Sequence, residues 1–147
     1  MRDYTIPLVK LSMVRDPSLQ DAERIRCGAD VKRIAAQMIG ESDREVFLVF
    51  HLDNKNRVIS AEAVSTGSLT MTLVHPREVF KAAILSNAAS IIVAHNHPSG
   101  DPTPSREDRD ITERLKSAGA LLGIPLVDHV VIGANDTYRS FAESGLL

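Results

Sequence analysis

Two almost unbroken apolar runs, EVFLVFHL at residues 45–52 and SIIVAHNH at residues 90–97, constrain the fold more than any other feature of the sequence. Both runs contain β-branched residues, and turn-forming residues lie beside them, so each predicts a buried strand. Strands that are apolar on both faces lie inside sheets that are covered on both sides. The rest of the chain must therefore supply helices that pack on a central sheet.

The segments around these runs alternate between helical and strand patterns. Apolar residues recur every three or four positions in three segments, and two further segments have strand composition. The expected helices are 17–39 (interrupted near Gly28), 75–88 and 106–122. The expected additional strands are 58–64, which would pair with 45–52 as a hairpin, and 124–133. Residues 4–14 are a possible edge strand. This order predicts a mixed α/β domain whose central sheet is partly antiparallel and is flanked by helices.

The composition limits the number of domains and the classes of partner. A chain of 147 residues with 44% hydrophobic content suffices for one core, so we expect a domain at 21–147 preceded by an N-terminal extension at 1–20. The formal net charge of -2 gives no strong nucleic-acid signal. A lone Cys27 cannot form an intrachain disulfide. With no signal-peptide pattern and no long apolar run, the expectation is a cytoplasmic protein with no membrane contact.

The end of the second run carries the candidate site. His95 and His97 lie on one face of the predicted strand, because side chains alternate along a strand. The segment PSGDPTP then turns the chain and brings Ser105 and Asp108 to a helix start near the same strand end. Two imidazoles and one carboxylate, with a position left for water, are the usual ligands of catalytic zinc. The pattern predicts one Zn²⁺ held by His95, His97 and Asp108.

A simpler interpretation of Ser105 and Asp108 stays open. SRED, at residues 105–108, is also a good capping box, with Ser105 as the N-cap and an acid at the third helical position. A helical wheel does not separate Asp108 from Glu107, because the two lie about equally far from the centre of the apolar face Ile111, Leu115, Ala118 and Leu122. The conjunction of two histidines at strand spacing, a turn and an acid on the next element favours the metal site.

A hydrolytic zinc site also needs a general base that is not a ligand. Glu45 at the start of the first run is the candidate, and Glu41 and Glu62 are its competitors. Three other histidines have ordinary structural explanations. We expect His51 to pack in the core, His75 to lie at a helix start or on the surface, and His129 to be a hydrogen-bonded strand residue, although Asp128–His129 could contact the metal ligands from behind.

At this point the pattern is similar to a known signature. His95-x-His97, seven residues, Ser105-x-x-Asp108 and a Glu some fifty residues upstream resemble the JAMM/MPN metalloproteases, and residues 74–133 resemble the bacterial RadC proteins, with the likeness running from about residue 25 to the C-terminus. The resemblance implies an MPN-type α/β fold, zinc on His95, His97 and Asp108, Glu45 as general acid and base, and Ser105 as the group that stabilises the oxyanion.

The resemblance also implies what the chain acts on and what it lacks. We expect hydrolysis of a peptide, isopeptide or other amide bond in a peptide or protein substrate. Full-length RadC proteins are expected to carry an N-terminal helix-hairpin-helix-like region, whereas only some 20 residues precede the MPN-like part here, which predicts a short form without that region. The residues alone indicate that STGSLT, residues 65–70, is a loop or strand end, which could line a groove for an extended peptide only if the strand beside it is an open edge.

Three rival functions remain open from the sequence. Two histidines and a carboxylate also describe the non-haem iron oxygenases, although alternating helices and strands do not suggest an all-β barrel. The domain could be a non-catalytic MPN-type binding scaffold, although inactive members would be expected to lose ligands. It could also be a DNA-associated accessory protein, in line with the DNA-repair label of the RadC family, and its binding would then weaken steeply with added salt.

Overall fold

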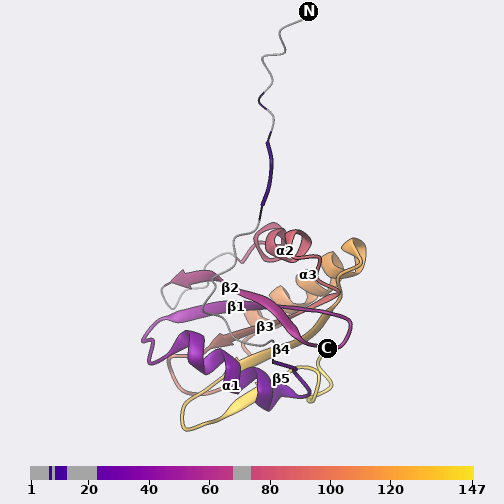
Figure 1. Ribbon diagram of the computed structural model, residues 1–147. Helices are drawn as coiled ribbons and strands as arrows, with labels where there is room; N and C mark the ends of the chain where they lie inside the picture. The colour runs from indigo at the N-terminus through magenta and orange to yellow at the C-terminus, as the bar shows by residue number, and fades with distance from the viewer. Residues whose placement is uncertain (1–6, 8, 13–22, 68–73) are drawn as a thin grey trace, which may run out of the picture.

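A five-stranded sheet with helices on both faces forms the body of the protein in the computed structural model, which describes residues 7, 9–12, 23–67 and 74–147 (Figure 1). In chain order the elements are α1 (Gly28–Ile39), β1 (Glu45–Leu52), β2 (Val58–Gly67), α2 (Pro76–Leu85), β3 (Ser90–Asn96), α3 (Arg106–Leu122), β4 (Leu126–Ile132) and β5 (Tyr138–Ser140). The predicted mixed α/β class is confirmed.

The sheet is mixed, and its two apolar strands lie at its centre. The spatial order is β2-β1-β3-β4-β5. β1 pairs antiparallel with both β2 and β3, β3 pairs parallel with β4 through the α3 crossover, and β5 pairs antiparallel with β4. The predicted hairpin between β1 and β2 is therefore present, and β2 is an edge strand with one neighbour among the described residues.

Two apolar clusters cover the two faces of the sheet. Phe47 and Val49 of β1 pack with α2 and α3, whereas the alternate residues Val46, Leu48 and Phe50 pack with α1. Figure 1 shows the same layers, with α1 on one side of the sheet and α2 and α3 on the other. This double coverage explains why almost every residue of β1 and β3 is buried.

Several predicted boundaries are confirmed and others shift. α3 spans the predicted 106–122 and ends at Gly123 in the left-handed conformation. β2 continues three residues beyond the predicted 58–64, and β3 ends at Asn96, one residue before His97. The short strand β5 was not predicted, because three residues of mixed polarity carry no strand pattern of their own and form a strand here by pairing with β4.

The first helix is shorter than its apolar pattern predicts. It begins at Gly28, residues 25–27 before it are not helical, and residues 17–22 lie outside the described part. At Gly28 the backbone N–H donates to Glu143 Oε1 over 2.7 Å, and a Cβ there would come within 2.7 Å of the Tyr138 ring. Contacts with Glu143 and Tyr138, which are distant in the sequence, thus fix the start of the helix, and the local spacing of apolar residues cannot predict such contacts.

The buried face of α3 also differs from the predicted one. Its buried residues are Asp108, Ile111, Thr112, Leu115 and Gly119. Leu122 is 46% exposed, so the prediction that it belongs to the apolar face is wrong. The face is rotated toward Asp108 and away from the exposed Glu107, which resolves the ambiguity of the helical wheel.

The N-terminal expectations fall mostly on residues outside the described part. Residues 7 and 9–12 have no regular secondary structure, and the rest of the possible strand at 4–14, like most of the 1–20 extension, lies outside it. Within the described residues, no helix is long and apolar enough to cross a bilayer.

Candidate metal centre

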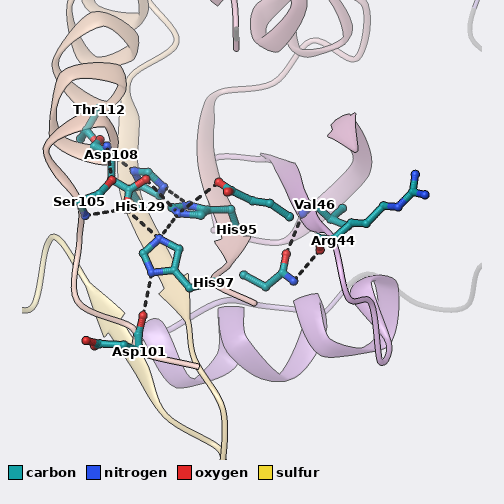
Figure 2. Close-up of polar contacts among 11 residues, drawn as sticks. Arg44, Val46, His95, His97, Asp101, Ser105, Asp108, Thr112 and His129 are labelled. Atoms are coloured by element: carbon teal, nitrogen blue, oxygen red, sulfur yellow. Dashed lines mark hydrogen bonds and ion pairs between the residues drawn. The ribbon is translucent and has the colours of Figure 1, made fainter. Parts of the chain in front are cut away.

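His95, His97 and Asp108 come together at one end of the sheet (Figure 2). His95 lies near the end of β3, His97 follows that strand directly, and Asp108 lies in the first turn of α3. The backbone N–H of His97 donates to Ile132 O of β4 over 2.9 Å, which continues the strand pairing by one residue and keeps His97 on the same side as His95. The turn 98–104 then returns the chain so that α3 begins over this end of the sheet.

The spacing of the donor atoms fits one metal ion. His95 Nε2 lies 3.0 Å from His97 Nε2 and 3.1 Å from Asp108 Oδ1, and His97 Nε2 lies 3.0 Å from Asp108 Oδ2. Ligands about 2.0–2.1 Å from a tetrahedral ion are roughly 3.3 Å from one another. The three side chains therefore already lie close to the edges of such a tetrahedron, and they could hold a metal ion.

The other nitrogen of each ring fixes which nitrogen faces the centre. His97 Nδ1 lies 2.7 Å from the carbonyl oxygen of Asp101, which can only accept, so Nδ1 carries the proton and Nε2 presents a lone pair. His95 Nδ1 lies 2.8 Å from His129 Nε2. Two lone pairs that face each other across 3.0 Å repel unless a cation lies between them. The two nitrogens are therefore stable at this distance only with a proton or a metal ion between them.

A chain of hydrogen bonds behind His95 sets its tautomer. The Thr112 hydroxyl lies 2.6 Å from Asp108 O and must donate to it, because that oxygen can only accept. His129 Nδ1 lies 2.6 Å from the same hydroxyl and must therefore donate its proton to it. Burial holds the pKa of His129 well below its usual value, so the ring is neutral, and its Nε2 accepts from His95 Nδ1. His95 Nε2 is left free for a metal.

These contacts answer the question about His129 and reveal a residue that the sequence analysis missed. His129 is a hydrogen-bonded strand residue, as predicted, and it also contacts His95 on the side away from Asp108. Asp128 does not contact the cluster: its carboxylate accepts from Ser140 Oγ over 2.6 Å and from Ala142 N over 3.0 Å. Thr112 was not singled out. Its position four residues after Asp108, on the same face of α3, is the only local signal of its role.

Asp108 is both a helix cap and a member of the site. Its carboxylate Oδ2 accepts from Ser105 N over 2.8 Å while its backbone N–H donates to Ser105 Oγ over 3.1 Å, so the predicted capping box is confirmed. Asp108 is only 4% exposed. Burial alone would raise its pKa, but when the Nε2 atoms of His95 and His97 carry a proton in place of a metal ion, their hydrogen bonds to the carboxylate outweigh burial and hold that pKa below the ordinary value. Asp108 therefore carries a negative charge that faces the two histidines.

The structure separates Glu45 from its two competitors. Glu45 Oε1 lies 3.9 Å from His95 Nε2, and the Glu45 side chain is 23% exposed. Glu41 lies exposed between α1 and β1. Glu62 lies opposite Val49, farther along β1, where burial raises its pKa and Lys81 and Glu78 of α2 are its charged neighbours. Of these three acids, Glu45 is the one that the structure brings to the histidines.

Ser105, two of the other histidines and residues 65–67 lie at the ends or in the interior of the helices and strands. Ser105 lies at the α3 N-cap, and its cap bond uses an oxygen lone pair, which leaves the hydroxyl proton for another acceptor. His75 occupies the N-cap of α2 without a side-chain cap bond. His51 is buried in β1, as expected, and its Nδ1 lies 2.7 Å from Ser60 Oγ. Of the segment 65–70, residues 65–67 end β2, and 68–70 lie outside the described part.

A cavity of about 790 Å³ opens beside the centre. One wall is α1, and the other walls come from the ends of β3 and β4, including His97, Pro98 and Gly133. Its volume is within the range of small-molecule pockets. His97, unlike the buried His95, is thus accessible from solvent.

Comparison with known proteins gives consistent matches. Residues 25–146 match the family described as RadC-like JAB domain. Among curated relatives, a UPF0758 protein of Trichlorobacter lovleyi is 49% identical over 129 residues, covering 88% of this chain and 56% of that protein. One from Symbiobacterium thermophilum is 60% identical over 103 residues (70% and 44%), and one from Methanosarcina acetivorans is 48% identical over 118 residues (80% and 51%). The chain spans about half the length of the curated relatives it matches.

Proposed function

The chain belongs to the RadC-like JAB domain family, and from this premise we propose that it is a zinc-dependent hydrolase of peptide, isopeptide or other amide bonds. The observation that carries the proposal is the convergence of two imidazole nitrogens and a buried carboxylate, with a further carboxylate, that of Glu45, 3.9 Å from His95. Two histidines and one acid, with a position left for water, are the ligand set of catalytic zinc.

His95, His97 and Asp108 would hold the ion, which when bound would activate a water molecule and polarise the scissile carbonyl. Glu45 would take the proton from that water and deliver it to the leaving amine. Glu45 is part exposed and lies beside the three proposed ligands rather than among them, which is the position that a general base requires. The Ser105 hydroxyl would donate a hydrogen bond to the carbonyl oxygen as negative charge develops on it.

The outer edge of β2 supports an extended peptide as the substrate. β2 has one neighbour among the described residues, and its Gly67 pairs with Glu45, so an added strand would lead toward the general base. Backbone hydrogen bonds along an open edge bind extended peptides with little dependence on sequence.

The first experiment measures metal content by elemental mass spectrometry. We expect about one zinc per chain after removal of metals with a chelator and reloading, and loss of that zinc in Asp108→Asn. Glu107→Gln, which removes the same charge from the exposed neighbouring residue, is the matched control and should keep its zinc. Stoichiometric zinc in Asp108→Asn would contradict the proposed ligand set. If the protein instead contained iron and its turnover required dioxygen, the chain would be an oxygenase and not a hydrolase.

A second experiment separates metal binding from catalysis. Glu45→Gln should keep the zinc and lose turnover of a peptide mixture, followed by mass spectrometry, by roughly 10²-fold or more, since a general base typically contributes that much. His95→Ala should lose both zinc and turnover. Glu41→Gln, which changes the exposed acid before β1, should leave both unchanged. A normal cleavage rate in Glu45→Gln would remove Glu45 from the mechanism.

A further inference from the structure

The two central strands separate where they reach the metal centre. The ladder between β1 and β3 ends at the pair Phe47 and His95. Beyond that pair each strand stays bonded to its outer neighbour: Glu45 still pairs with Gly67 of β2, and Asn96 still pairs with Ile132 of β4. An opening therefore forms between β1 and β3, with Glu45 on one side of it and the two histidines on the other.

The Asn96 side chain bridges this opening. Asn96 Oδ1 accepts from the backbone N–H of Val46 over 2.7 Å, and Asn96 Nδ2 donates to the carbonyl oxygen of Arg44 over 2.9 Å. Figure 2 shows these bonds as the dashed lines at Val46 and Arg44. Asn96 is 8% exposed; its bond to Val46 is buried, and its bond to Arg44 is part-buried. A side-chain amide thus takes the place of the next backbone rung of the sheet.

The two bonded groups are the peptide units on either side of Glu45. The Arg44 carbonyl belongs to the peptide before the Glu45 Cα, and the Val46 N–H belongs to the peptide after it. Fixing both peptide planes fixes the direction in which the Glu45 side chain leaves the backbone. Within the described part of the chain the Glu45 carboxylate has no hydrogen bond of its own, so its direction is set through the backbone.

An amide is suited to this place for two reasons. It offers a donor and an acceptor in one plane without charge. Ordinary backbone pairing would bring the strands to about 4.8 Å and close the opening, and an apolar side chain would leave the buried Val46 N–H and the part-buried Arg44 carbonyl without this partner.

We propose that Asn96 is a positioning residue for Glu45: its amide holds β1 and β3 apart and aims the Glu45 carboxylate at the metal centre. This inference rests on the proposed function of that centre. Asn96 itself lies on the other face of β3 from His95 and His97, where it lines the cavity beside α1, so its connection to the metal centre runs through Glu45.

The test compares Asn96→Ala and Asn96→Asp with Ser60→Ala, which removes the hydrogen bond between Ser60 and His51 near the other end of β1. The first readout is amide hydrogen exchange of Val46 by NMR in the zinc-loaded chain. Exchange should become roughly tenfold faster in Asn96→Ala, as expected for the loss of one hydrogen bond, and stay unchanged in Ser60→Ala. Asn96→Asp keeps the acceptor for Val46 and should keep most of the protection.

The second readout is cleavage of the peptide mixture. In Asn96→Ala, kcat should fall roughly 10²-fold with KM nearly unchanged and one zinc still bound, because a misplaced general base slows the chemical step. Asn96→Asp should lie between Asn96→Ala and the unchanged chain. Faster Val46 exchange with a kcat no lower than that of Ser60→Ala would overturn the proposal, as would unaltered Val46 exchange in Asn96→Ala.

A third readout needs no turnover. With cobalt(II) in place of zinc, the visible absorption responds to groups beside the coordination sphere, and Asn96→Ala should reproduce the spectral change caused by Glu45→Gln, whereas Ser60→Ala should not. If the unchanged chain cleaves no peptide, the proposed function fails while this comparison still decides the role of Asn96. A cobalt spectrum that changes in Glu45→Gln and stays normal in Asn96→Ala would overturn the positioning role.

Discussion

At the scale of single residues, proton positions decide what this cluster can bind. Thr112 touches none of the atoms that would meet a metal, yet its hydroxyl determines the tautomer of His129 and, through it, that of His95. Residues that hydrogen-bond to the other nitrogen of a metal-binding histidine orient its ring and raise its basicity. The centre therefore extends from the ligands into the buried polar contacts between α3 and β4.

Replacing Thr112 by Val should weaken metal binding while the fold persists. Valine has nearly the same shape but no hydroxyl, so His129 Nδ1 loses its acceptor and the ring is free to adopt the other tautomer. We expect zinc affinity, measured at neutral pH by competition with a chromophoric chelator, to fall roughly 10- to 100-fold. Thr137→Val removes a similar hydroxyl-to-carbonyl bond in the turn before β5 and should not alter the affinity. Equal affinities in the two variants would contradict the relay.

At the scale of elements, the first turn of α3 serves two purposes. The capping box formed by Ser105 and Asp108 begins the helix, and the same Asp108 faces the histidines. The two interpretations that the sequence left open, a cap or a ligand, are thus compatible in one residue. A substitution of Asp108 would therefore alter the start of α3 and the candidate metal centre together.

Substitutions at Ser105 should separate capping from catalysis. Ser105→Ala should lower the free energy of unfolding by about 1 kcal/mol, whereas Ser105→Gly should cost only a few tenths, because glycine is an acceptable N-cap. Both variants lack the hydroxyl, so both should lose roughly 10²- to 10³-fold in kcat if that hydroxyl stabilises the oxyanion. Urea unfolding and peptide cleavage measure the two effects. If kcat instead fell only in Ser105→Ala and stayed nearly normal in Ser105→Gly, Ser105 would serve as a helix cap and not in catalysis.

The sequence predicts the elements and the ligand spacing better than the contacts between distant segments. Strand alternation placed His95 and His97 on one face, and the cap pattern located Asp108 correctly at the start of α3. Thr112 and Asn96 were missed because their partners lie on other elements, and no local pattern encodes a side chain that bonds a neighbouring strand. The start of α1 and strand β5 were mispredicted for the same reason: Glu143 and β4, respectively, determine them.

At the scale of the whole molecule, buried neutral histidines tie stability to pH. His51 is 1% exposed, and burial lowers its pKa to about 4. In the unfolded chain its pKa is about 6.5, so between these two values the unfolded state binds a proton that the folded state does not. This contribution to stability is complete above pH about 6.5, decreases as the pH falls toward about 4, and changes no further below it.

Replacing His51 by Leu should therefore flatten the acid side of the stability profile. Between pH 7 and 4.5 the free energy of unfolding of the metal-free chain should fall by about 2 to 3 kcal/mol more in the unchanged protein than in His51→Leu, because over the roughly 2 pH units between 6.5 and 4.5 only the unfolded chain binds this proton, at about 1.36 kcal/mol per unit. Urea unfolding at both pH values provides the measurement. His129 is present in both proteins, so the difference between their stability profiles reports on His51 alone. Parallel profiles would show that the fold does not hinder protonation of His51.

The stacking of Phe141 on His129, with ring centroids 4.8 Å apart and planes inclined by 13°, has a consequence for how the protein is made. Ribosomes add roughly 5 to 20 residues per second, from the N-terminus onward. His95, His97 and Asp108 are thus all synthesised before His129, which sets the tautomer of His95, and before Phe141, which packs against His129. A nascent chain has His95, His97 and Asp108 for seconds before it has the surroundings that orient them, so we expect the proposed metal ion to bind the finished domain rather than the growing one.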